Sequence, residues 1–182
     1  LEVTIRAAKM LDYPKEKLRI HLLDDGGTDQ KINAENPVSA ATAKQRRQDL
    51  QALCKRLDIT YHTRAKNEFA KAGNVNSAIQ NTTGDLIVIL DADHVPTSDF
   101  LDRTVPWMLK NEKVFLVQTP HFMANPDPVE RNYFSAFTRM PSENDMFYGT
   151  IQKGLDYWGS SFFCGSAALM RRKHLDLVGG IS

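Results

Sequence analysis

The chain has 182 residues, of which 42% are hydrophobic and 25% charged, with a formal net charge of +1. This length supports one sizeable α/β core, and the near-neutral charge gives no indication of nucleic-acid binding. No stretch approaches the roughly 20 apolar residues that a transmembrane helix needs. Cys54 and Cys164 lack metal-type spacing, and Cys54 falls on a helical pattern, so the sequence favours a reducing compartment over a disulfide framework.

Apolar periodicity predicts strands and helices that alternate up to about residue 118. The predicted strands lie at 18–23, 59–61, 86–90 and 114–118. The predicted helices lie at 1–10, at 40–57 and, despite Pro106, at 100–109. A further helix is predicted to follow a loop at 67–72 and to end at about residue 80. Such alternation is typical of an α/β domain with a mainly parallel sheet flanked by helices.

The composition changes beyond residue 119. A turn cluster at 125–128 begins a segment rich in aromatic and methionine side chains, namely Tyr133, Phe134, Phe137, Met146, Phe147 and Tyr148. A short apolar piece follows at 167–170. With no repeats and no linker, we predict one domain over 1–182. Because position 1 falls inside a helical pattern and the sequence at 179–182 ends abruptly, we expect the domain to be incomplete at both ends.

Two acids follow the strand predicted at 86–90. Asp91 and Asp93, with His94 adjoining, stand at its carboxyl end, which is where ligands bind in open α/β sheets. Paired carboxylates there suit a hard divalent cation shared with substrate phosphates. The alternative is a solvated acidic turn, and it is the better reading of such a pair taken alone.

Two other strand-to-helix junctions carry polar residues. Asp24 and Asp25 precede two glycines in a tight turn, and Lys71 stands where a helix opens at 70–74. Each taken alone reads better as an ordinary surface feature. Together with the acid pair, they predict a site for a nucleoside diphosphate and its cation.

These motifs resemble the GT-A fold of glycosyltransferase family 2, a Rossmann-like nucleotide-sugar transferase fold. More closely, they resemble the catalytic domains of bacterial cellulose synthases. The matching segments cover nearly the whole chain and lie at 24–29 (DDGGTD), 67–68 with 70–74 (NE, AKAGN), 91–94 (DADH), 118–122 (QTPHF), 125–128 (NPDP) and 162–167 (FFCGSA). The resemblance divides the chain into a nucleotide-sugar-binding half (1–118) and an acceptor-side half (119–182).

The resemblance also implies residue roles. Asp25, Lys71 and Asp91 would bind the nucleotide sugar, UDP-glucose, with Asp25 on the uridine and Lys71 near the diphosphate. Asp91, Asp93 and His94 would bind Mg²⁺ or Mn²⁺, and Asp93 and Lys71 would act in catalysis. The acceptor-side residues would be Phe162, Phe163, Cys164, Gly165 and, more loosely, His121; core packing is the alternative for the phenylalanines.

The implied reaction is inverting transfer of glucose to a growing β-1,4-glucan. The resemblance places a first strand before Leu1, and the general base and the acceptor clamp beyond Ser182, so this piece alone should be inactive. Were the base inside the chain, Glu143, Asp145 and Asp156 would be the first candidates.

The implied parent protein is a bacterial inner-membrane protein with this domain in the cytoplasm. It would also have membrane segments, a cyclic-di-GMP-binding domain and a periplasmic partner subunit. A synthase of another β-glycan, of the chitin or hyaluronan type, and a non-catalytic nucleotide-sugar-binding domain remain alternatives.

Overall fold

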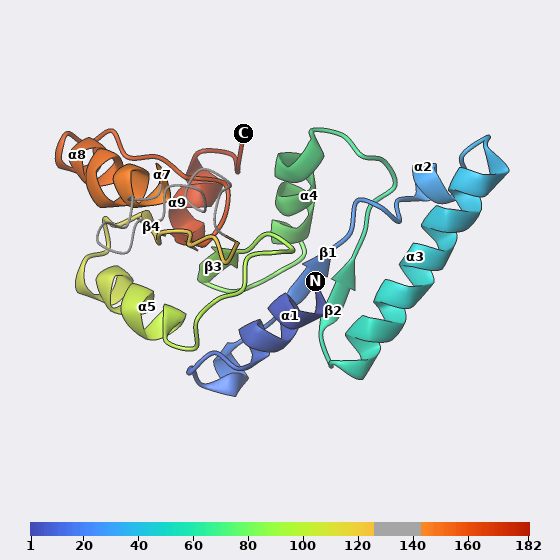
Figure 1. The fold of residues 1–182 in the computed structure, drawn as a ribbon, viewed down its shortest axis with the longest axis horizontal. Helices are drawn as coiled ribbons and strands as arrows, with labels where there is room; N and C mark the ends of the chain where they lie inside the picture. The colour runs from blue at the N-terminus through green and yellow to red at the C-terminus, as the bar shows by residue number, and fades with distance from the viewer. Residues whose placement is uncertain (126–142) are drawn as a thin grey trace, which may run out of the picture.

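The computed structural model describes residues 1–125 and 143–182 (Figure 1). The helices are α1 (Glu2–Lys9), α2 (Asp29–Ile32), α3 (Pro37–Arg56), α4 (Ala70–Ile79), α5 (Phe100–Lys110), α7 (Glu143–Met146), α8 (Gln152–Tyr157) and α9 (Arg172–Leu177), with a 3₁₀ turn η1 (Lys15–Lys17) and a π-helical turn η2 (Phe147–Ile151). The strands are β1 (His21–Leu23), β2 (Thr60–His62), β3 (Leu86–Ile89), β4 (Leu116–Gln118) and β5 (Ala168–Arg171). Most of the turn expected at 125–128, and Tyr133, Phe134 and Phe137, lie outside the described residues. No described helix is long and apolar enough to span a membrane.

The strands form two hydrogen-bonded groups. β1 and β2 pair in parallel, with His21 opposite Thr60. β5 lies between β3 and β4 and runs antiparallel to both, so β3 and β4 run in the same direction. The α/β fold class predicted from the alternating elements is confirmed, and the apolar piece expected at 167–170 is the central strand of the second group.

Strand β5 is buried on both faces, and each face belongs to a different core cluster. Leu169 packs with the apolar side of α5, including Met108. Ala168 and Met170 point to the other face, where they meet Val75 of α4 and a group that includes Leu175 of α9. Successive strand residues face opposite sides of a sheet, so this uninterrupted apolar strand joins the two clusters into one core.

The apolar pattern does not predict α2, α7, α8 and α9, and the starts of two predicted helices differ from those observed. α3 begins at Pro37, three residues before the predicted start, because the Asn36 side chain caps it by accepting from the Val38 and Ser39 amides. α4 begins at Ala70, inside the predicted loop. Phe69, which precedes the helix, and Ala70, its first residue, have φ angles of 57° and 43°.

A gap separates β1 from β3. Within the described residues the two strands belong to different sheets, and between them lies a cavity of about 430 Å³. Its walls come from α1, β1, α4 and β3 and are largely apolar, with Lys71 and Asp91 at one end. This cavity therefore reaches the same edge of the molecule as the predicted site.

A histidine pair spans the β1–β2 pairing. His21 Nδ1 lies 2.9 Å from His62 Nε2. Burial lowers the pKa of both imidazoles, and for His21 the positive charge that His62, Arg172 and Arg19 can carry lowers it further. Both rings therefore favour the neutral form in the folded chain, where one ring nitrogen can donate to the other.

The histidine pair predicts a loss of stability in mild acid. Because the folded pKa values lie below the ordinary value of 6.5, the unfolded chain takes up protons first as the pH falls through that value. The free energy of unfolding, measured in urea at pH 7.5 and 5.5, should decrease at the lower pH. The decrease should be smaller in His62→Asn and unchanged in His174→Asn. An equal decrease in all three proteins would contradict the assignment.

Candidate functional site

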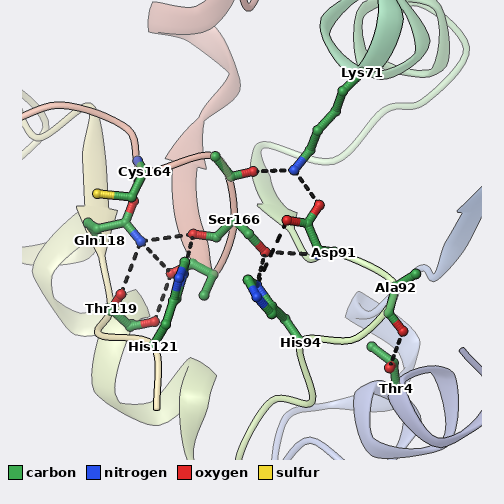
Figure 2. Close-up of polar contacts among 12 residues, drawn as sticks. Thr4, Lys71, Asp91, Ala92, His94, Gln118, Thr119, His121, Cys164 and Ser166 are labelled. Atoms are coloured by element: carbon green, nitrogen blue, oxygen red, sulfur yellow. Dashed lines mark hydrogen bonds and ion pairs between the residues drawn. The ribbon is translucent and has the colours of Figure 1, made fainter. Parts of the chain in front are cut away.

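The register of β5 against β3 builds the centre of the site. Ile89 lies opposite Ala168, so two residues further along Asp91 lies opposite Ser166. The Asp91 amide donates to Ser166 Oγ at 2.8 Å, and His94 Nδ1 lies 2.7 Å from the same oxygen (Figure 2). Ser166 is 1% exposed. This buried hydroxyl fixes the turn after β3 and bonds Nδ1 of His94, whose Nε2 has no hydrogen-bond partner among the described residues.

Lys71 reaches the same place from α4. Its ammonium pairs with the Asp91 carboxylate and also donates to the Gly165 carbonyl at 2.6 Å (Figure 2). On the other side of the turn, Thr4 of α1 donates to the Ala92 carbonyl at 2.7 Å. The structure therefore brings Lys71, Asp91 and His94 together, and a shared ligand for them stays a prediction.

The two acids at the end of β1 have different environments. Asp24 is 1% exposed and accepts from Tyr61 Oη at 2.9 Å, Arg46 Nε at 3.0 Å and the Gly26 amide at 2.9 Å. Burial, together with the bond to Asp24, raises the pKa of Tyr61 to about 12, so the phenol stays a donor. Asp25 is partly exposed and pairs with Arg64. Asp24 is thus fully engaged inside the fold, and Asp25 is the acid that a ligand can reach.

Asp93 is exposed and makes no hydrogen bond or ion pair with a described residue. Within 1–125 and 143–182 no three His, Cys, Asp or Glu side chains gather closely enough to hold a metal by themselves. Asp91 nevertheless already attracts a cation, the Lys71 ammonium. Mg²⁺ commonly takes one or two carboxylates and completes its shell with phosphate oxygens and water. Asp91 and Asp93 fit that mode of binding.

Gln118, at the end of β4, holds the segment that precedes β5. Its Oε1 accepts from the Cys164 amide at 2.9 Å, and its Nε2 donates to the Ser166 carbonyl at 2.8 Å (Figure 2). Gly165 between them has a φ of 88°, a conformation that favours glycine. One amide side chain therefore sets the shape of the predicted acceptor loop.

His121 is fixed in one tautomer. Its Nε2 lies 3.1 Å from the Ser166 carbonyl, which can only accept, so Nε2 carries the proton. Nδ1 then accepts from Tyr148 Oη at 2.9 Å. Burial raises the pKa of Tyr148 to about 12, so this phenol also remains a donor.

The two phenylalanines of the predicted acceptor segment have different environments. Phe163 packs against the second core cluster, in agreement with the alternative of core packing, whereas Phe162 is 49% exposed. Phe162 lies at the rim of a cavity of about 610 Å³ that His121, Tyr148, Asp145 and Asp156 also line. Glu143 is not among the residues that line it. Sequence reasoning gave no separate role to Tyr148, Ser166 or Arg64, because no local pattern marks them.

Comparison with known proteins identifies the family of the chain. The sequence model of Glycosyl transferase family 2 matches residues 1–179. The chain belongs to this family. It is 42% identical over its whole length to the "Cellulose synthase catalytic subunit [UDP-forming]" of Pseudomonas fluorescens (strain SBW25), and 41% identical to "Cellulose synthase 1" of Komagataeibacter xylinus. The chain spans 22% of the first protein and 10% of the second.

A solved structure shows the same fold. The mannosyltransferase PcManGT from Pyrobaculum calidifontis, in complex with GDP-Man and Mn²⁺, superposes with a TM-score of 0.59 at 22% identity, covering the whole of this chain and 43% of that one. The family 2 chain therefore has the predicted GT-A fold, as a partial domain. The division into 1–118 and 119–182 stays a prediction; β5, from the second range, lies between two strands of the first.

The buried hydroxyl of Ser166 gives a prediction for stability. Ser166→Ala leaves the Asp91 amide and His94 Nδ1 without their partner, so the free energy of unfolding should fall by about 1–3 kcal/mol. Chemical denaturation in urea measures it. Ser160→Ala, at an exposed position in the same part of the chain, is the matched control and should change the value by less than about 0.5 kcal/mol. Equal effects of the two substitutions would contradict a structural role for Ser166.

Proposed function

We propose that the chain is the donor-binding part, with some of the acceptor side, of a longer UDP-forming cellulose synthase. That enzyme would transfer glucose from UDP-glucose to a growing β-1,4-glucan. The observation that carries the proposal is a chain of contacts between separate elements. Arg64 pairs with Asp25 and donates to the Ala70 carbonyl, and the next residue, Lys71, pairs with Asp91. The identity of about 40% to cellulose synthase catalytic subunits favours this glucan over chitin or hyaluronan.

On the donor side, Asp25 accepts hydrogen bonds from the uridine and Lys71 lies beside the diphosphate. Asp91 and Asp93 would hold Mg²⁺ or Mn²⁺, with His94 adjoining. A divalent cation in this place supplies positive charge near the leaving diphosphate. The mannosyltransferase solved with GDP-Man and Mn²⁺ has the same fold, which supports a nucleotide sugar and a divalent metal as ligands.

On the acceptor side, the terminal glucose lies against Phe162 and the backbone of Cys164 and Gly165, with His121 facing the donor sugar. The acceptor 4-hydroxyl oxygen attacks the anomeric carbon, the bond from that carbon to the diphosphate breaks, and UDP leaves with the electron pair. Lys71 stabilises the charge that grows on the departing oxygen. The acceptor proton passes to a general base that we place in the longer protein, beyond Ser182.

The cavity between β1 and β3 is the place for the strand that the resemblance puts before Leu1. Among the described residues, the edges of β1 and β3 that face the cavity do not pair with each other, and the walls of the cavity are largely apolar. Membrane segments, a cyclic-di-GMP-binding domain, a periplasmic partner and an inner-membrane location belong to the proposed parent protein.

Metal-dependent nucleotide binding tests the proposed function in this chain. UDP titrated calorimetrically should bind in the presence of Mn²⁺ and lose at least tenfold in affinity when EDTA replaces the metal. Asp93→Asn should remove that dependence, and in the longer protein it should abolish glucose transfer. Asp102→Asn, at an exposed position on α5, is the control and should bind like the unmodified chain. An equal UDP affinity with Mn²⁺ and with EDTA would overturn the proposal.

Parallel titrations with UDP-glucose and UDP-N-acetylglucosamine identify the donor.

Lys71 should affect metal and nucleotide in opposite directions. In Lys71→Ala the Asp91 carboxylate loses its ammonium partner, so Mn²⁺ alone should bind about two- to fivefold more tightly. UDP in the presence of Mn²⁺ should bind tenfold or more weakly, because a charged donor to the diphosphate is lost. In the longer protein kcat should fall as well. Mn²⁺ and UDP affinities that change in the same direction would assign Lys71 a structural role instead.

A further inference from the structure

Arg64, in the segment after β2, forms an ion pair with Asp25. Its Nε donates to Asp25 Oδ1 at 2.8 Å and its Nη2 donates to Asp25 Oδ2 at 2.9 Å. The Arg64 side chain is 11% exposed and that of Asp25 is 23% exposed. This is the planar two-bond arrangement that a guanidinium forms with a carboxylate and that an ammonium cannot reproduce. Asp25 is therefore held in a single orientation.

The same guanidinium also holds the turn that leads into α4. Nη1 donates to the Glu68 carbonyl at 2.5 Å. Nη2 shares its two hydrogens among Asp25, the Ala70 carbonyl at 2.8 Å and Asn67 Oδ1 at 2.9 Å. Phe69 and Ala70 within this turn have positive φ values, which side chains disfavour. The turn thus depends on contacts from outside itself, and Arg64 supplies several of them.

Helix α4 has a glycine where the guanidinium lies against it. A Cβ at Gly73 would fall 2.6 Å from Arg64 Nη1 and 2.1 Å from the Glu68 carbonyl oxygen. The approach to the Glu68 carbonyl would require the backbone to move, and the approach to Nη1 would require the guanidinium to shift. The absence of a side chain at Gly73, one helical turn from the start of α4, therefore leaves room for the Arg64 guanidinium.

We propose that Arg64 is a positioning residue for nucleoside recognition. It holds Asp25 so that the carboxylate accepts the ring N–H of a uracil, and it ties that acid to the residue preceding Lys71. The inference rests on the proposed function. Each carboxylate oxygen keeps a second lone pair after Arg64 has used one, so the fork leaves Asp25 able to bind a ligand.

Base selectivity separates this role from a merely structural one. Uracil carries a hydrogen on its ring nitrogen N3, whereas neutral cytosine has a lone pair there, which a carboxylate repels. A correctly oriented Asp25 therefore favours UDP over CDP. A general loosening of the turn would weaken both nucleotides alike and leave their ratio unchanged.

The experiment compares UDP and CDP affinities, with Mn²⁺ present, in the unmodified chain, Arg64→Lys, Asp25→Asn and the double variant. Arg64→Lys keeps the charge but loses the fork, and the preference for UDP should fall about tenfold. Asp25→Asn should lose the preference as well, and adding Arg64→Lys to it should lower the preference no further. Arg103→Lys, in an exposed pair on α5, is the matched control and should keep the full preference.

The outcomes distinguish this inference from the proposed function. If the unmodified chain prefers UDP and Arg64→Lys retains that preference, or weakens UDP and CDP equally, Arg64 does not position Asp25. If the unmodified chain binds neither nucleotide, the proposed nucleotide site itself fails. Thermal melting of each variant shows whether equal weakening comes from a loss of folded protein.

Discussion

The site depends on the pairing of β5 between β3 and β4. The register sets Ser166 opposite Asp91 and brings Gln118 to the same edge, although these residues are far apart in the chain. Since β5 is buried on both faces, a slip of one residue would reverse which of its side chains meets which core cluster. The hydrophobic packing that fixes the strand therefore also fixes the functional geometry.

Three of the carboxylates around this edge are paired with cations from other elements. Arg46 pairs with Asp24, Arg64 with Asp25, and Lys71 with Asp91. Burial decides what each pair can do. The Asp24 side chain is buried although Arg46 is 54% exposed, so losing a partner would leave the carboxylate charge less compensated inside the fold. The Asp91 and Lys71 side chains are both well exposed, so their ion pair can open and exchange partners at little cost.

The donor and acceptor sides share structural elements. Ser166 contributes its hydroxyl to the turn that carries Asp91, and its carbonyl accepts from His121 and Gln118. Tyr148 in the π-helical turn η2 extends this hydrogen-bonded group through His121. In a family 2 glycosyltransferase, such sharing makes the position of the predicted acceptor loop dependent on that of the acid pair.

The sequence by itself determined the alternating strands and helices and the acids at the strand ends, because apolar periodicity and turn chemistry are local properties. Its motifs also identified the family. Only the tertiary structure decided that the apolar piece at 167–170 is the central antiparallel strand. It also separated Asp24 from Asp25 and Phe162 from Phe163, and joined Arg64 to Asp25. These outcomes depend on which distant segments pack together, and neighbouring residues of the same type carry no local signal of which one the core will bury.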